Sequence, residues 1–186
     1  MERIYVHRSL HDAFVERLTA RAEALRLGGG LDWSADVGPL ISQQQLDRVS
    51  EHVTDAVAKG ATVAAGGRAR PDVGPLFYAP TVLTGVTEQM RCFGEETFGP
   101  VVSVYAFDDV EAVLRTVNSG PYGLNASVWT RDIRRGRDVA QRIDTAELLT
   151  TLALVTDVDR AVETGRTALG LEGLAKALPA LQPVAL

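Results

Sequence analysis

Apolar residues follow two alternating patterns along the first 143 residues of the chain. Short runs rich in β-branched and apolar side chains predict strands at residues 4–6, 62–65, 81–83, 100–105 and 126–129. Between them, apolar residues spaced three or four positions apart predict helices at residues 9–25, 42–58, 109–118 and 132–143. Strands that alternate with helices indicate an α/β fold, in which a mostly parallel sheet is flanked by helices.

The first two helices carry recognisable end signals. Ser9 is the predicted N-cap of the first helix, and the three glycines at 28–30 are interpreted as its stop. Because these glycines follow a helix and not a strand, they lack the context of a phosphate-binding loop. Ser42 together with Gln45 predicts a capping box at the start of the second helix.

Composition narrows the class of protein. The chain has 186 residues, a formal net charge of -5, 46% hydrophobic residues and 23% charged residues, as is typical of a soluble globular domain. The negative charge gives no general attraction to nucleic acid or to an anionic membrane. The chain shows neither a signal-peptide pattern nor an apolar run of the ~20 residues that a membrane helix needs. A cytoplasmic location is therefore expected.

Residues that could bind metal or act as nucleophiles are few. The single cysteine, Cys92, excludes an intramolecular disulfide and a multi-cysteine metal site. The histidines His7, His11 and His52 form no ligand pair at useful spacing, so no metal site is predicted. His11 and His52 are interpreted as residues on charged, solvated helix faces. Cys92 is interpreted as a small, partly buried hydrophobic residue and not as a catalytic nucleophile.

The segment from 94 to 102, G-E-E-T-F-G-P-V-V, carries the clearest chemical signal. A carboxylate at the entrance to a strand can accept hydrogen bonds from the vicinal hydroxyls of a ribose. An aromatic residue two positions later lies on the same side of an extended backbone and can pack on a planar ring. Ligands also collect at strand ends in open α/β sheets. From the residues alone, a charged turn before a strand explains the segment equally well.

Residues 95–101, E-E-T-F-G-P-V, resemble the E-E-x-F-G-P-V signature of the NAD(P)-dependent aldehyde dehydrogenases. Further segments resemble that family in the same order along the chain, namely 2–7, 38–42, 60–63, 66–67, 78–83 and 122–130. The resemblance covers residues 1–143 and implies part of the catalytic domain of a two-domain subunit. It further implies that Glu96 binds the ribose next to the nicotinamide and that Phe98 positions the nicotinamide ring. Glu95 would be structural, the cofactor NAD or NADP, and the substrate a small aldehyde.

The chain also departs from the family pattern. In the family, the nucleophilic cysteine precedes the segment that matches residues 2–6, and the general-base glutamate, the oxyanion-hole asparagine and the cofactor loop lie further upstream. The resemblance therefore implies a truncated chain with no catalytic residue of its own, and Cys92 is not assigned the missing role. Beyond Ile143 the sequence diverges, and residues 144–186 are expected to form a helical C-terminal tail.

Two functions remain open. The first is an oxidoreductase of the aldehyde dehydrogenase family that is inactive as an isolated chain. The second is a non-catalytic binding or assembly module, which would pair with a full-length relative or with a separately encoded N-terminal half. In either case we expect an exposed apolar surface of several hundred Å² and a tendency to form homo-oligomers or to bind that missing half.

Overall fold

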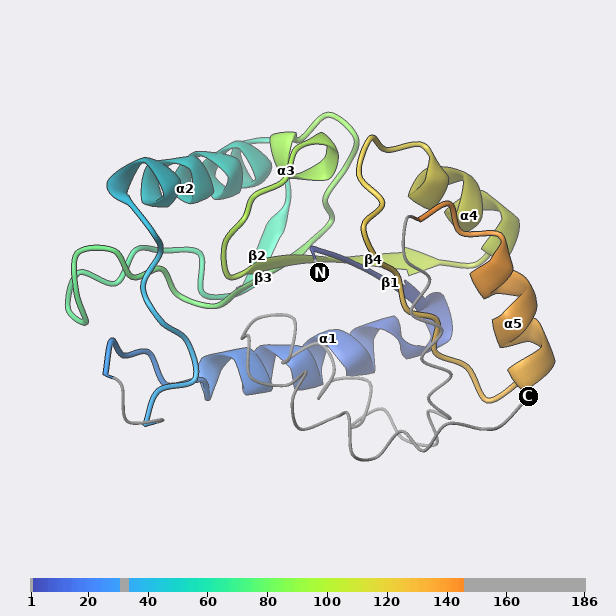
Figure 1. Ribbon diagram of the computed structural model, residues 1–186, viewed down its shortest axis with the longest axis horizontal. Helices are drawn as coiled ribbons and strands as arrows, with labels where there is room; N and C mark the ends of the chain where they lie inside the picture. The colour runs from blue at the N-terminus through green and yellow to red at the C-terminus, as the bar shows by residue number, and fades with distance from the viewer. Residues whose placement is uncertain (1, 31–33, 146–186) are drawn as a thin grey trace.

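A computed structural model describes residues 2–30 and 34–145 of the chain. Figure 1 shows its architecture, a central sheet with helices on both faces. The elements in chain order are β1 (Arg3–His7), α1 (Arg8–Glu23), α2 (Gln43–Ala58), β2 (Thr62–Ala65), β3 (Thr81–Thr84), α3 (Arg91–Gly94), β4 (Val101–Phe107), α4 (Val110–Asn118) and α5 (Ile133–Gln141).

The sheet has the strand order β1-β4-β3-β2. Strands β1 and β3 both run parallel to β4, with Arg3 opposite Ser103 and Thr81 opposite Val101, whereas β2 pairs antiparallel with β3. The predicted α/β fold with a mostly parallel, helix-flanked sheet is therefore confirmed. Parallel strands need long crossover connections, and α1, α2 and α3 lie within those connections.

Helix α1 covers one face of the sheet (Figure 1). Its side chains Phe14, Leu18 and Ala22 are buried at the three- to four-residue spacing that the sequence predicted. They pack against alternate residues of the strands, including Val102 and Val104 of β4. This layer forms the first hydrophobic core.

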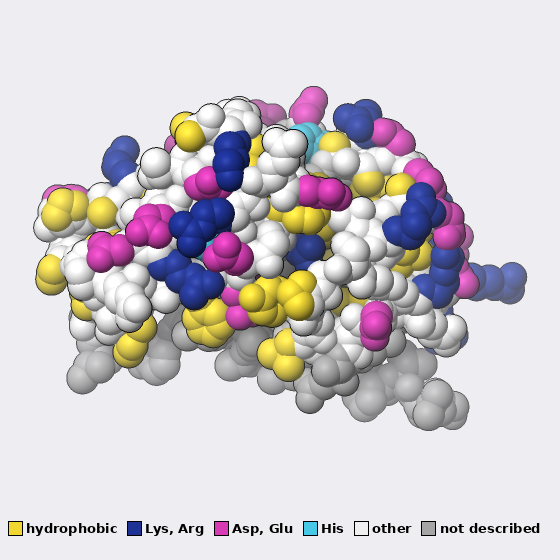
Figure 2. Space-filling view, turned by 90° about the horizontal axis from the view of Figure 1, so that it is seen from above, with side chains coloured by type: hydrophobic (Ala, Val, Ile, Leu, Met, Phe, Trp, Pro, Cys, Tyr) yellow, Lys and Arg dark blue, Asp and Glu magenta, His cyan; other side chains and the backbone are white. Residues whose placement is uncertain are grey.

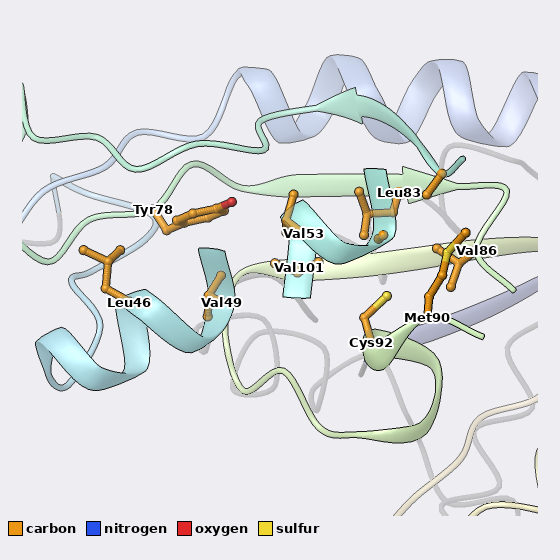
Figure 3. Packing of buried hydrophobic residues seen from close by; sticks show 11 residues of the cluster. Leu46, Val49, Val53, Tyr78, Leu83, Val86, Met90, Cys92 and Val101 are labelled. Atoms are coloured by element: carbon orange, nitrogen blue, oxygen red, sulfur yellow. The ribbon is translucent and has the colours of Figure 1, made fainter. Parts of the chain in front are cut away.

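Helix α2 covers the opposite face, together with the short helix α3 (Figure 1). Figure 3 shows Val49 and Val53 of α2 directed at the sheet, where Leu83 of β3 and Val101 of β4 lie. Cys92 of α3 belongs to the same cluster and is buried. Val101 and Val102 thus serve opposite cores, as expected from the two-residue alternation of a strand that is covered on both faces.

Helices α4 and α5 lie next to each other at the far end of the molecule from α2 (Figure 1). The guanidinium of Arg142, which follows α5, pairs with Glu111 of α4. The Asn118 side-chain amide donates to the Arg142 carbonyl at 2.8 Å and its oxygen accepts from the Asp144 N–H at 3.0 Å. Asp109 and Asp132 cap the N-termini of the two helices.

The predicted start of the first helix is wrong by two residues. Helix α1 begins at Arg8, and His7 is its N-cap: the Nδ1 atom of His7 accepts from the Ser9 N–H at 3.3 Å and lies 2.8 Å from the Ser9 hydroxyl. Because β1 continues through His7, the helix begins directly at the strand end, and an imidazole nitrogen supplies the acceptor that Ser9 was expected to provide. The helix ends at Glu23, before the glycines.

Two further expectations fare differently. The Ser42 hydroxyl accepts from the Gln45 N–H at 3.2 Å, which confirms Ser42 as the N-cap of α2. The strand predicted at residues 126–129 is not among the strands of the described residues, although Asn125 and Trp129 each take part in an isolated bridge. Its β-branched and aromatic residues favour extended backbone, which does not by itself make a strand of the sheet. The tail expected over residues 144–186 lies, apart from its first two residues, outside the described part of the chain.

Candidate functional site

The segment between α3 and β4 contains the predicted site residues. Thr97 is buried with 2% of its surface exposed, whereas Phe98 is 72% exposed and Glu96 is also exposed. Phe98 has φ 53, so the backbone is left-handed at this residue and not extended as the sequence interpretation assumed. Glu96 and Phe98 nevertheless both present their side chains at the surface, on either side of the buried Thr97.

The carboxylate of Glu2 holds the segment from one side. Its two oxygens accept from the Thr97 N–H at 2.9 Å and from the Phe98 N–H at 2.7 Å. Glu2 directly precedes β1, and the β1–β4 pairing brings it beside the start of β4, where the Ser103 N–H also donates to the Glu2 carbonyl at 2.9 Å. Hydrogen bonds to a charged acceptor are stronger than bonds between neutral groups.

Gln45 holds the same segment through its carbonyls. The Nε2 atom donates to the Thr97 carbonyl at 2.7 Å and to the Phe98 carbonyl at 2.9 Å. Gln45 therefore serves α2 only through its backbone N–H at the Ser42 cap, and its side chain is directed at the site.

His52 contradicts the prediction of a solvated histidine. It is fully buried, and its Nδ1 lies 3.1 Å from the Thr97 hydroxyl. Its Nε2 lies 3.4 Å from a carboxylate oxygen of Glu95, a contact that falls short of hydrogen-bond geometry. Burial lowers the pKa of His52, and the nearby Glu95 carboxylate opposes this only in part. The ring is thus neutral near pH 7, with Nδ1 assigned as the acceptor from Thr97.

Glu95 takes part in a network of charged side chains at the C-terminal end of α3. Its carboxylate lies 3.6 Å from Nε of Arg91, whose guanidinium holds the pKa of Glu95 below its usual range. Arg91 also pairs with Glu51 of α2 at 3.2 Å, and its N–H donates to Asp55 at 2.9 Å. These contacts join α3 to α2, so Glu95 stabilises the local structure.

Gly99 and Pro100 connect this segment to β4 and determine how closely the backbone approaches α2 and β3. A Cβ atom at Gly99 would lie 2.5 Å from Cγ2 of Val49, so only glycine allows the backbone to pass this close to α2. The Pro100 carbonyl accepts from the Thr81 N–H of β3 at 2.7 Å, which starts the β3–β4 pairing. Close approach to α2 therefore explains the glycine in this position.

Cys92 has the environment of a packing residue. Burial raises the pKa of its thiol, and its neighbours in the second core are apolar. A thiol with little thiolate is a poor nucleophile at neutral pH. Within residues 2–30 and 34–145, no group of three or more histidine, cysteine or acidic side chains could bind a metal ion.

A hollow of about 1040 Å³ lies beside β1, which is the outer strand of the described sheet. It is lined by β1, α4, α5, the segment 119–131 and residues 92–96, so Glu96 borders it and Phe98 does not. Figure 2 shows apolar side chains in a depression between the α2 and α5 sides, while basic and acidic side chains intermingle over α2. No helix within the described ranges is both long and apolar enough to cross a membrane.

The model of the aldehyde dehydrogenase family matches residues 1–169. The chain belongs to the aldehyde dehydrogenase family. A Mycobacterium ulcerans protein that carries the name succinate-semialdehyde dehydrogenase (NADP+) 2 is 52% identical over 143 residues, which are 77% of this chain and 28% of that protein. A Schizosaccharomyces pombe succinate-semialdehyde dehydrogenase (NADP+) is 42% identical over 142 residues, 76% of this chain and 29% of that protein.

Solved structures of aldehyde dehydrogenases have the same fold. The NAD+ complex of the Bacillus cereus enzyme superimposes with a TM-score of 0.76 at 38% identity and covers 81% of this chain, which in turn covers 30% of that enzyme. Betaine aldehyde dehydrogenase from Staphylococcus aureus with NAD+ gives a TM-score of 0.74 at 35% identity, covering 79% and 30% of the two chains. The chain thus spans less than a third of the length of these relatives.

Three residues that hold the site were missed from the sequence as site residues. Gln45 was recognised only as a capping residue, and Glu2 carried no signal, because its partners lie about 95 residues away. For His52 a signal did exist. His52 lies three positions after Val49 and four before Ala56, so its spacing alone places it on the buried face of α2.

Proposed function

We propose that this chain forms the nicotinamide-side wall of an NAD(P)-dependent aldehyde dehydrogenase site. In this proposal the Glu96 carboxylate accepts hydrogen bonds from the ribose hydroxyls, and the exposed ring of Phe98 packs on the nicotinamide. The observation that carries it is a large aromatic side chain, 72% exposed, on a left-handed backbone held by Glu2 and Gln45. An exposed aromatic ring on a backbone that is held in place suits a planar ligand.

The chemistry proposed is the oxidation of a small aldehyde. A bound nicotinamide nucleotide supplies the hydride acceptor for such a reaction. Glu96 and Phe98 would orient that acceptor and contribute no proton transfer or covalent bond. The names of the relatives, succinate-semialdehyde dehydrogenases among them, support an aldehyde substrate and the use of NAD(P).

We further propose that the isolated chain does not turn over aldehyde. Attack on an aldehyde needs an activated nucleophile and a general base. Cys92, the only cysteine, is buried in an apolar cluster and its pKa is raised. This cysteine is therefore not proposed as the nucleophile. Any reproducible aldehyde-dependent formation of NADH or NADPH by the isolated chain would overturn this part of the proposal, and its loss in Cys92→Ala would identify Cys92 as the nucleophile.

A second candidate function is a binding or assembly module. The supporting observation is the hollow of about 1040 Å³ beside β1, together with the small share of each relative that the chain spans. In this alternative the hollow receives another polypeptide, such as the N-terminal half of a relative. Co-purification of the chain with a fragment that contains the first two thirds of a relative would support this alternative. Elution of the chain as a separate monomer from a mixture with that fragment in size-exclusion chromatography would contradict it.

Nucleotide binding tests the first proposal directly. We suggest titrating the isotopically labelled full chain with NAD+ and NADP+ and following backbone and aromatic NMR signals. We expect shifts centred on Glu96 and Phe98, with millimolar affinity. The variants Glu96→Gln and Phe98→Ala should weaken binding severalfold, while Glu16→Gln, at an exposed position of α1 that is remote from the segment in sequence, should not. Shifts confined to other regions, or none at all, would refute the proposal.

A further inference from the structure

We propose that Glu2 and Gln45 are positioning residues that clamp the Thr97–Phe98 backbone, Glu2 at its N–H groups and Gln45 at its carbonyls, while His52 contacts the Thr97 hydroxyl. The inference rests on the proposed function, since it assigns these residues to the orientation of Phe98 and Glu96 toward a nicotinamide nucleotide. None of the three would touch the nucleotide through a role of its own. They act by fixing the residues that do.

The conformation of Phe98 requires such support. It is the sole non-glycine residue with positive φ in the described part of the chain. Left-handed backbone is unfavourable for a residue with a Cβ atom and persists where the surroundings determine it. Residues in this state gather at ligand-binding sites, where the strain serves pre-organisation. An exposed aromatic side chain cannot supply the restraint through its own packing.

The hydrogen bonds of Glu2 and Gln45 supply such a restraint. Glu2 accepts from the N–H groups of Thr97 and Phe98, and Gln45 donates to the carbonyls of the same two residues. These four groups belong to three consecutive peptide planes. Fixing the planes before and after Phe98 sets both of its backbone dihedrals, because a planar peptide leaves only two free rotations per residue. The direction in which the Phe98 side chain leaves the backbone follows from them.

The hydrogen-bonding groups of Glu2 and Gln45 match those of the backbone that each side chain contacts. An ionised carboxylate is purely an acceptor and can take two N–H groups, whereas an amide nitrogen carries two protons and can serve two carbonyls. Glutamine at position 2 would place a donor against the N–H groups, and glutamate at position 45 would place an acceptor against the carbonyls. Glu2→Gln and Gln45→Glu thus reverse part of the polarity of the clamp with almost no change in shape.

The clamp also couples separate elements. Gln45 and His52 are seven residues apart on α2 and so lie on one helix face, while Glu2 reaches the segment from the start of β1. His52 contacts the Thr97 hydroxyl at 3.1 Å, which keeps Thr97 buried between the two exposed residues. The segment is therefore held by the helix and the sheet at once.

Amide hydrogen exchange and nucleotide titration of the labelled full chain test the proposal together. We expect Glu2→Gln and Gln45→Glu each to speed exchange at Thr97 and Phe98 about tenfold, the effect of losing one hydrogen bond. We expect the nucleotide-induced shifts at Glu96 and Phe98 to require about tenfold more NAD+ in both variants. The matched controls are Glu16→Gln on α1 and Gln44→Glu on α2, both at exposed positions.

Each outcome separates the possible failures. Unchanged exchange at Thr97 and Phe98 in both variants would overturn the clamp. Faster exchange with unchanged NAD+ dependence would show a structural contact without a positioning role, which also overturns the inference. If NAD+ shifts no signal even in the unaltered chain, the proposed function fails, and the exchange data still report whether the clamp exists. Core amides in β4 serve as the reference for overall stability.

Discussion

Gly99→Ala is the most sharply defined perturbation of the site. The added methyl would lie 2.5 Å from Cγ2 of Val49, and Val49 is fully buried between α2 and the sheet. Normal contact between two carbon atoms is about 3.5 to 4.0 Å, so roughly 1 Å of movement is needed. Val49 cannot provide it by turning toward solvent. The strain therefore falls on the backbone between Phe98 and β4.

The expected cost follows from two opposing effects. Overpacking a buried contact of this kind destabilises a protein by about 1–3 kcal/mol. Replacing glycine by alanine reduces the entropy of the unfolded chain, which returns about 0.4–1 kcal/mol. The net loss is about 1–2 kcal/mol, or a fall in melting temperature of about 2–8 °C for a chain of this length.

Urea unfolding of three variants checks this reasoning. Gly94→Ala is the matched control, since a Cβ atom there meets no atom within 4 Å. Val49→Ala removes both methyl groups that crowd Gly99, so Gly99→Ala should no longer destabilise the protein in that background. The double-mutant cycle should then give a coupling equal to the overpacking cost, about 1–3 kcal/mol. Equal stability of the Gly99→Ala and Gly94→Ala proteins, or a coupling of zero, would refute the reasoning.

Three further predictions concern buried groups. Burial lowers the pKa of His52 below its ordinary value of about 6.5, so on acidification the unfolded chain takes up the proton before the folded chain does. The stability that the neutral ring contributes is therefore complete above about pH 6.5 and is lost as the pH falls below that value. Urea unfolding at several pH values should show a steeper acid loss for the unaltered chain than for His52→Gln, and equal slopes would contradict this. Cys92 should react with a disulfide reagent only after unfolding in urea, and rapid labelling of the folded chain would contradict its burial. Leu83→Ala should cost about 2–5 kcal/mol in urea unfolding, whereas Leu124→Ala at a 73% exposed site should stay within about 0.5 kcal/mol; similar losses would contradict the core assignment.

The sequence predicted those elements that local periodicity determines. The strand at residues 62–65 agrees with β2, and the helix at 109–118 agrees with α4 and its Asp109 cap. In both cases the signal lies within the element itself. The strand expected at 126–129, which is not among the strands of the described residues, has a local signal too, but pairing depends on a neighbour that no local pattern specifies.

The site was predictable in part. The residues of segment 95–100 left a charged turn and a ligand-binding segment equally open, and only the resemblance to the family signature singled the segment out as a candidate site. The groups that fix this segment could not be predicted, since the contact between Glu2 and Phe98 joins residues 96 apart. His52 was placed on the wrong face because its polarity was weighted above its spacing. Polarity is a poor guide to exposure when a side chain has a buried hydrogen-bond partner, as His52 has in Thr97.

The parallel pairing of β1 with β4 has a consequence for the order of folding. Arg3 lies opposite Ser103, so closing this ladder joins parts of the chain that are about 100 residues apart. Strands β2, β3 and β4 are closer in sequence, and the entropy of loop closure favours their assembly first. We expect β1 to dock last and to bring Glu2 with it. The segment around Thr97 and Phe98, whose N–H groups bind Glu2, would then acquire its final conformation only in the last stage of folding.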